Sequence, residues 1–386
     1  MVSLQTADIA LKNFYLDAVA RELDAKVSPF LAKLEKSSAY VTGKDINKII
    51  KLGINGGVAA GSETGDLPKG DSCDYITFKS TLKNLYGTIE ITDKAIRASA
   101  NDEGGFVNLL NEEMDGLVKS AKYNFSRMLF GDGNGYLATV VSAGTTAGVL
   151  TSINGLIPGM YIDFWKDGKR THSKIKITAV DKNRRSIEMT GADLSNAGAP
   201  SAGSDVRVCG CEDGYELTGL AALFSPDNIY GVNRTSEYMR PFIEDSIGEL
   251  SEDIVQTAID TIEQISGSKV NFILCSWGVR RALTRCIKER QAILSMTDLG
   301  DNQYVLTYNG IPVVADRFCP EGTMYLLNTD DFKLCQLCDW QWMEGEDGKI
   351  LKQVAGKPIY TATLVKYAEL ICERPCGQGM LTDIDV

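Results

Sequence analysis

The chain has 386 residues, with 51 acidic against 40 basic side chains and a formal charge of −11. This length is enough for two or three domains with their own cores. The acidic surface should repel nucleic acid, so the composition excludes strong general binding to DNA.

The beginning of the chain, MVSLQTADIALKNFYLDAV, carries acids inside its apolar pattern and lacks an uninterrupted apolar stretch. No apolar run reaches the roughly 20 residues of a membrane span. We therefore expect no signal peptide, no membrane contact and synthesis in the cytoplasm. In that compartment the ten cysteines are expected to be free thiols.

The first segments predict an arm and a projection. Apolar residues between Ile9 and Leu23 favour a helix that ends before Ser28. Residues 51–70 read KLGINGGVAAGSETGDLPKG and are too poor in bulky side chains to form a core. Strand-forming residues follow at 75–78 and 85–91, so we expect a long two-stranded projection with a mobile tip. Because an isolated hairpin is marginal in water, it should lie on another subunit.

The clearest helix covers residues 105–130. Its apolar residues are spaced by three or four along one stripe: Phe106, Leu110, Met114, Leu117, Ala121, Phe125 and Met128. At about 1.5 Å per residue, it should be roughly 38 Å long.

The stretch LFGDGNG, residues 129–135, invites comparison with phosphate and calcium loops. However, the helix precedes it, so the negative end of the helix dipole faces the loop. In a calcium loop the twelfth position would be a glutamate, whereas Ala143 stands here. We interpret the stretch as a turn that ends the helix.

Short strand candidates at 160–165, 174–180, 186–189 and 205–208 predict a small β-barrel or β-sandwich within residues 148–216. A mixed region follows, with helices at 247–265 and 277–287 and strands at 272–275, 311–315 and 324–327. Residues 359–372 are mostly β-branched or aromatic and predict a long strand.

The candidates for chemistry are weak. His172 stands alone next to basic residues and is expected to be a solvent-exposed residue on a loop. The pairs Cys209 with Cys211 and Cys335 with Cys338 would bind zinc only if they met in space. FKLCQLCDW is typical of a strand, which points residues three apart to opposite faces. Structural thiols are therefore favoured over zinc and over a redox motif, and we expect no enzyme and no cofactor.

A basic helix, VRRALTRCIKER, places Arg281, Arg285 and Lys288 on one side. Three interpretations stay open, in decreasing order of weight. The stripe is a solvated face, an electrostatic contact with an acidic neighbouring subunit, or a nucleic-acid patch without interleaved aromatics.

The order of these parts, with the segments ETGDLP, ELTGLAALF, DNIYGVNRT and ICERPCGQG, resembles the major capsid proteins of tailed bacteriophages. The resemblance implies an α+β chain with the Hong Kong 97-type fold. Its implied parts are an N-terminal arm (1–50), an extended β-hairpin loop (51–85), a peripheral domain with the long spine helix (86–147), a β-rich insert (148–216), an axial domain (217–328) and return strands to the C-terminus (329–386).

The same resemblance implies a structural protein of the virion, which assembles in the bacterial host cytoplasm into hexamers and pentamers of an icosahedral shell around double-stranded phage DNA. The main partner of the chain is then other copies of the same chain. Separate scaffolding, portal and decoration proteins are possible further partners, and a weak non-specific contact with DNA is expected. The implied subunit interface comprises Gly56, Gly57, Glu63, Asp66, Leu67, Pro68, Lys69, Arg281, Arg285 and Lys288. Two alternatives remain, namely an encapsulin-like nanocompartment shell and a cytosolic zinc or thiol enzyme.

Overall fold

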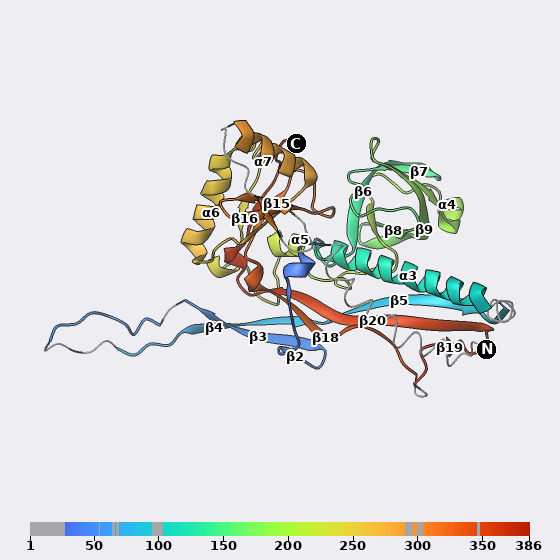
Figure 1. The fold of residues 1–386 in the computed structure, drawn as a ribbon, viewed down its shortest axis with the longest axis horizontal. Coiled ribbons are helices and arrows are strands. Elements are labelled where there is room, and N and C mark those ends of the chain that lie inside the picture. The colour runs from blue at the N-terminus through green and yellow to red at the C-terminus, as the bar shows by residue number, and fades with distance from the viewer. Residues whose placement is uncertain are drawn as a thin grey trace.

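The computed structural model describes residues 28–53, 55–63, 66, 69–94, 103–289, 296–298, 304–345 and 348–386. The chain is an α+β protein built on a long sheet, with a hairpin projecting at one end, a closed barrel above the sheet and a second sheet covered by helices (Figure 1). Within the described residues, no helix is both long and apolar enough to cross a membrane. All ten cysteines are free thiols, which confirms the prediction.

The long sheet is centred on β20 (Ile359–Cys372), the long strand that the sequence predicts. β20 pairs with β5 (Lys83–Thr92) over the whole of β5, and with β18 (Phe332–Trp342) on its other side. Two short strands complete the sheet: β1 (Glu35–Ser37) and β19 (Lys352–Gln353).

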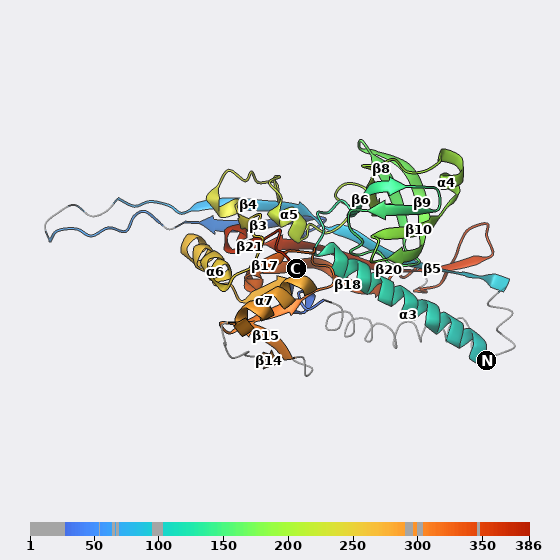
Figure 2. The same ribbon diagram turned by 90° about the horizontal axis from the view of Figure 1, so that it is seen from above.

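The spine helix α3 (Glu103–Met128) lies along this sheet in both views (Figures 1 and 2). Met114 and Phe125 are buried in the core between helix and sheet, and Leu117 packs against it. A Cβ placed on Gly87 of β5 would lie 3.0 Å from the Leu117 side chain, so glycine lets the helix approach the strand closely. The predicted helix is confirmed.

The projecting hairpin is formed by β3 (Asp45–Leu52) and β4 (Asp74–Thr81), which are antiparallel over their full length. The sequence predicts a two-stranded projection and its strand at 75–78, which lies in β4, but it assigns the wrong partner strand. The strand-forming residues 85–91 belong to β5 and pair with β20, and the partner of β4 is β3, most of which lies in the expected arm (1–50). A short strand, β2 (Val41–Thr42), extends the hairpin sheet.

The end of the expected arm is part of the core. Phe30 is fully buried between the rings of Phe130 and Phe332, with centroid distances of 6.4 and 5.4 Å, and β1 pairs in parallel with β18. Residues 1–27, with the predicted helix of the arm, lie outside the described residues.

The β-rich insert is a closed six-stranded barrel. Its strands are β6 (Tyr136–Ala143), β7 (Ala147–Leu150), β8 (Tyr161–Lys166), β9 (Lys169–Asp181), β10 (Ser186–Thr190) and β11 (Asp205–Val208), with the short helix α4 (Ala192–Ala197). Alternate residues such as Ile162, Phe164, Ile175 and Ile177 fill its interior. The barrel begins at Tyr136, before the expected start of the insert at residue 148.

A seven-stranded sheet forms the remaining body. In spatial order it contains β12 (Phe242–Glu244), β21 (Gly379–Leu381), β17 (Met324–Leu327), β13 (Phe272–Cys275), β16 (Ile311–Ala315), β15 (Tyr304–Tyr308) and β14 (Met296–Asp298). Three of these, β13, β16 and β17, have the bounds that the sequence predicts.

Helices α6 (Glu252–Ser266) and α7 (Trp277–Glu289) cover one face of this sheet, and the short helix α5 (Leu220–Phe224) belongs to the core on the other face. The predicted start of α6 at 247 is wrong. Ser251 caps the helix by accepting a hydrogen bond from Ile254 N, and Gly248 has φ +65°, which is incompatible with a helix at that point.

Candidate assembly surfaces

The root of the hairpin is fixed to the body by buried contacts. Phe78 is fully buried and stacks on Tyr230 at 5.3 Å, and the Lys79 amide donates to the Tyr230 carbonyl at 2.9 Å. On the opposite strand, the buried Lys48 ammonium pairs with Glu373 and lies 3.9 Å from the centroid of the Tyr40 ring. These contacts set the direction in which the hairpin leaves the molecule.

The outer face of the hairpin is mostly polar, but it carries two exposed apolar side chains. Side chains alternate between the faces of a strand, so Ile46, Ile50 and Phe78 point to the core. On the other face, Ile49 is 68% exposed and Tyr75 is 66% exposed. This face therefore retains apolar area that could be buried against another molecule.

In the tip, residues 53–73, the two sides of the hairpin contact each other among the described residues. Asn55 donates to the Asp71 carbonyl and accepts from Gly57 N at 2.7 Å, and Val58 is 88% exposed. A Cβ on Gly57 would lie 3.1 Å from Asp71 N, so glycine lets the two sides of the tip approach each other.

Several predicted interface residues lie on this tip. Gly56, Glu63, Asp66 and Lys69 are exposed, and Gly57 is half-buried. Leu67 and Pro68 lie outside the described residues. The structure places the described ones on one projection, while their role in an interface stays a prediction.

The three basic residues of α7 form the surface stripe that the sequence predicts. Arg281, Arg285 and Lys288 are all exposed, and the opposite side of the helix is buried against the sheet through Val279 and Leu283. Arg280 stacks over the Trp277 ring at 4.6 Å. The stripe is therefore a charged surface and makes no contribution to the core.

Two ion pairs connect neighbouring strands of the long sheet. Glu369 is fully buried; burial raises its pKa, partly offset by Lys83 at 3.6 Å. Its carboxylate also accepts from Thr218 N at 2.8 Å, so it ties the linker after the barrel to β20. Burial alone would raise the pKa of Asp339, but the Lys366 ammonium and the hydrogen bonds from Trp340 N and Lys36 together lower that pKa to about 2.

The cysteine pairs do not form a metal site. Among the described residues, no group of three or more His, Cys, Asp or Glu side chains could hold a metal ion. Cys335 lies inside β18, where burial raises its pKa to about 11, and Cys338 is half-buried on the same strand. Burial raises the pKa of Cys211 to about 12 and also raises that of Cys209. A raised pKa keeps Cys209, Cys211 and Cys335 in the thiol form at neutral pH, which is typical of structural cysteines.

The stretch LFGDGNG is a structural junction between α3 and the barrel. Gly133 and Gly135 have positive φ, and Asp132 accepts a hydrogen bond from Asn134 N at 2.9 Å. The incoming linker pairs with the outgoing one, because Glu216 N donates to the Gly133 carbonyl at 3.1 Å. A Cβ at Gly135 would lie 2.6 Å from the Cys211 sulfur, which explains a glycine at that position.

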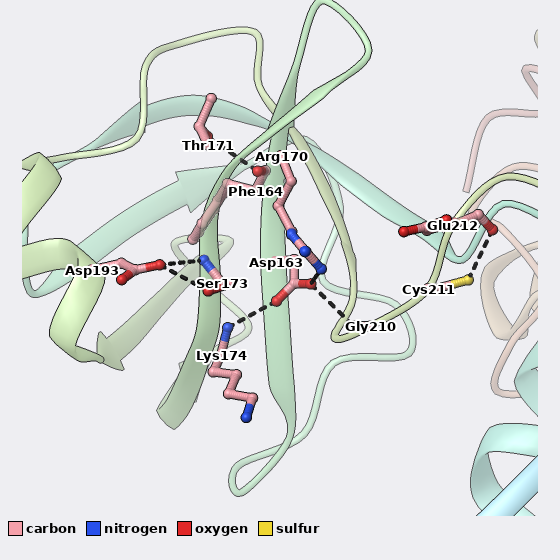
Figure 3. A network of polar contacts seen from close by, with 10 residues as sticks. All are labelled: Asp163, Phe164, Arg170, Thr171, Ser173, Lys174, Asp193, Gly210, Cys211 and Glu212. Carbon is pink, nitrogen blue, oxygen red and sulfur yellow. Dashed lines mark hydrogen bonds and ion pairs between the residues drawn. The ribbon is translucent and has the colours of Figure 1, made fainter.

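A buried carboxylate organises the barrel wall, as Figure 3 shows. Asp163 accepts from Lys174 N at 2.8 Å and from Gly210 N at 3.0 Å, with the Arg170 guanidinium at 3.5 Å. Lys174 has φ +52°, so the carboxylate stabilises an irregular point of β9 and also holds the loop that leaves the barrel. This role of Asp163 could not be predicted from the sequence, because it depends on the backbone amides of residues 174 and 210, which the fold brings to the carboxylate.

The prediction for His172 is wrong. The ring is buried in the barrel, edge-on to Phe164 at 5.9 Å, with Nε2 at 3.1 Å from the Gly198 carbonyl. Its basic neighbours suggest a surface loop, but in strand β9 the alternation of side chains turns His172 inward.

Comparison with known proteins identifies the type of fold. No family model matches the sequence, and no curated protein matches it. Among solved structures, the capsid asymmetric unit of cyanophage A-1(L) matches with a TM-score of 0.54 and 11% identity, over 93% of each chain. The chain therefore has the Hong Kong 97-type fold of phage capsid proteins, as the resemblance predicts.

Two further structures match over most of their length. The holo-SrpI encapsulin complex of Synechococcus elongatus PCC 7942 has a TM-score of 0.46 and 10% identity, over 96% of this chain and 95% of that one. The procapsid of satellite phage P4 including the size determination protein has a TM-score of 0.44 and 12% identity, over 97% of this chain and 100% of that one.

Proposed function

We propose that this chain is a major capsid protein, a structural subunit that assembles with copies of itself into a closed shell. The observation that carries the proposal is the projecting hairpin, in a chain with a capsid fold. Its root is anchored in the core, while its outer face and tip are exposed.

The physical argument concerns where the hairpin is stabilised. A two-stranded ribbon is marginal in water without a further layer. Phe78 and Lys48 supply that layer at the root, whereas Ile49, Tyr75 and Val58 have none among the described residues. A neighbouring copy that covers this face would complete the ribbon and link the two subunits.

At the finer level, we propose hexamers and pentamers in an icosahedral shell that encloses double-stranded DNA, assembled in the bacterial cytoplasm and carried in the virion. A shell can be stable although each contact between two subunits is weak, because each subunit binds several neighbours at once and the association constants of these contacts multiply. The charge of −11 is compatible with a DNA container, since the inner wall must not adhere to its cargo. Separate scaffolding, portal and decoration proteins are compatible with this role, and we propose no catalytic activity.

The direct test is electron microscopy of the purified chain, alone and with a candidate scaffold. We expect closed particles of uniform size. Nuclease-protected DNA in particles from infected cells would support the DNA container, whereas particles filled with a protein cargo would indicate a nanocompartment. Persistent monomers with turnover of a small substrate would overturn the proposal.

A deletion of residues 55–70 tests the role of the tip. We expect a folded, soluble subunit that assembles poorly, because the tip has few contacts with its own body. The matched control keeps the length of the tip and carries Ala59→Ser with Ser62→Ala, at exposed tip positions outside the implied interface, and should assemble like the wild type. Loss of the circular dichroism signal in the deletion variant would mean that the tip belongs to the core.

A further inference from the structure

The barrel is a basic part of an acidic chain. Residues 136–208, which form its strands and their connections, contain nine lysine and arginine residues against six aspartate and glutamate residues, a net charge of +3. Because the whole chain carries −11, the remaining residues carry −14. The barrel, which lies beside the spine helix in Figure 1, therefore concentrates positive charge in one part of the molecule.

Two adjacent strands, β8 and β9, contain five of these nine basic residues: Lys166, Lys169, Arg170, Lys174 and Lys176. Ile162 and Ile175 fill the interior of the barrel. Their neighbours along the chain, Tyr161 and Lys176, therefore face outward. These two are paired across the strands, with the Lys176 ammonium 6.0 Å from the centroid of the Tyr161 ring. The exposed side chains of the two strands, namely Tyr161, Lys169, Arg170, Lys174 and Lys176, define the β8–β9 wall.

Three lysines of the wall have no carboxylate partner. Lys169, Lys174 and Lys176 are exposed and form no ion pair within the described part of the chain. Figure 3 shows the Lys174 side chain directed away from the Asp163 carboxylate. That carboxylate is buried and lies 3.5 Å from the Arg170 guanidinium instead. The wall therefore presents three ammonium groups to its surroundings.

We propose that the β8–β9 wall is a contact site for the phosphate groups of double-stranded DNA. The inference rests on the proposed function and deepens it, since it names the surface that would meet the enclosed DNA. Lysine, threonine and tyrosine side chains are among the usual donors to DNA phosphates. Exposed Thr178 and Tyr161 supplement the lysines of the wall, and Thr190 of β10 lies opposite Lys176. Phosphate contacts carry no sequence information, so we expect binding without sequence preference.

Double-stranded DNA fits this wall better than the acidic surface of a second copy. Protein interfaces are depleted in lysine and have apolar and aromatic side chains at their centre. Both strands are described in full, and Tyr161 is the only large hydrophobic side chain exposed on them. DNA, by contrast, carries about one charge per 1.7 Å of its axis, so lysines can reach phosphates without a matching shape.

Three lysine contacts give a weak and salt-sensitive interaction. The logarithm of the association constant falls linearly with the logarithm of the salt concentration, and three phosphate contacts contribute about 3 to this slope. The exposed Asp167 in the turn between the strands and the charge of −14 on the rest of the chain oppose the attraction. A weak local contact is compatible with a container whose wall must not adhere to its cargo.

The test removes positive charge at the wall and, in a control, at a different surface. The wall variant carries Lys169→Gln, Lys174→Gln and Lys176→Gln. The conservative variant carries Lys169→Arg, Lys174→Arg and Lys176→Arg, and it keeps the charge. The control variant carries Arg281→Gln, Arg285→Gln and Lys288→Gln. It loses the same charge as the wall variant, but on α7, where all three side chains are exposed.

The measurement is the association constant of full-length, unassembled subunits for a fluorescent DNA duplex of about 30 base pairs, by anisotropy at several salt concentrations. We expect the wall variant to bind at least about tenfold more weakly than the wild type at low salt, with a salt slope smaller by about 3. The conservative and control variants should stay within about threefold of the wild type, because the phosphate contacts remain. Thermal melting checks that every variant is folded.

The outcomes separate this inference from the proposed function. Shells that form from a protein without measurable affinity for DNA would overturn the contact and retain the capsid. DNA binding that is lost only in the wall variant, in a protein that never forms shells, would retain the contact and contradict the capsid. The contact is also overturned if the control variant is weakened as much as the wall variant, or if the wall variant keeps its affinity for DNA. In the latter case, impaired shell formation by the wall variant would assign the wall to the acidic surface of a second copy.

Discussion

The outer face of the hairpin should contribute to assembly and not to folding. We consider the double substitution Ile49→Ser and Tyr75→Ser. Both side chains are about two-thirds exposed in the subunit. Full burial of an apolar side chain contributes about 1.5–3 kcal/mol, so a neighbour that covers the exposed part would gain about 1–2 kcal/mol for each residue. The pair would thus contribute about 2–4 kcal/mol per contact, or roughly 30-fold to 700-fold in the association constant.

Two assays separate assembly from folding. Light scattering with negative-stain microscopy gives the protein concentration above which particles form, and this threshold should rise by about the factor above. Chemical denaturation of unassembled subunits should show a free energy of unfolding within about 0.5 kcal/mol of the wild type, as for exposed substitutions in general.

The matched control is Ile49→Val with Tyr75→Phe, which keeps most of the apolar area. We expect its assembly threshold to stay within about fivefold of the wild type, since one methylene corresponds to about 0.8 kcal/mol. An unchanged threshold in the serine variant would refute the reasoning, because the face would then stay exposed in the particle. A loss of several kcal/mol in the isolated subunit would refute it as well, because the face would then belong to the core.

Three further predictions concern the subunit itself. Phe78→Ala should lower the free energy of unfolding by about 3–5 kcal/mol in urea denaturation, because the ring is fully buried at the hairpin root. Gly135→Ala should cost about 1–3 kcal/mol, because φ is +67° and the new Cβ would lie 2.6 Å from the Cys211 sulfur, whereas Gly144→Ala, with no atom closer than 3.7 Å, should be near neutral in the same assay. The pKa of Asp339 is lowered from 3.8 to about 2, so the ionised carboxylate stabilises the folded subunit fully above about pH 4, and this stabilisation is lost as the pH falls toward 2. In the Asp339→Asn variant, the free energy of unfolding should therefore fall by about 1 kcal/mol less between pH 4 and pH 2 than in the wild type, after discounting for partial exposure.

Continuous apolar strands could be located from the sequence with the correct bounds. β13, β16 and β17 are bounded by turn residues and are rich in β-branched or large apolar side chains. The stripe of α3 and the long strand β20 were equally clear, because their periodicity extends over many residues. These elements owe their structure to patterns that are local in the chain.

Partners distant in sequence could not be deduced in the same way. The segment DINKIIKL has too many polar residues to stand out, yet it is the β3 half of the hairpin, because β4 pairs with it over its full length. For the same reason the barrel begins earlier in the chain than the sequence predicts, since β6 is recognised only by its pairing with β7 and β11. Local patterns specify elements, while register depends on contacts across the fold.

The candidate surfaces could be predicted from the sequence where their residues lie close together along the chain. The spacing of Arg281, Arg285 and Lys288 predicts a stripe, and all three are exposed. The anchoring role of Lys48 was missed, since an exposed lysine is the ordinary expectation and only Tyr40 and Glu373 make its burial favourable.

The outer face of the hairpin carries two apolar side chains among polar ones. β3 directs Ile46 and Ile50 inward, and Ile49 stands outward between the exposed Asn47 and Lys51; β4 directs Phe78 inward and Tyr75 outward. A face that meets only solvent should carry polar side chains. Under the proposed function, a neighbouring copy would cover Ile49 and Tyr75, which are about two-thirds exposed in the described part of the subunit.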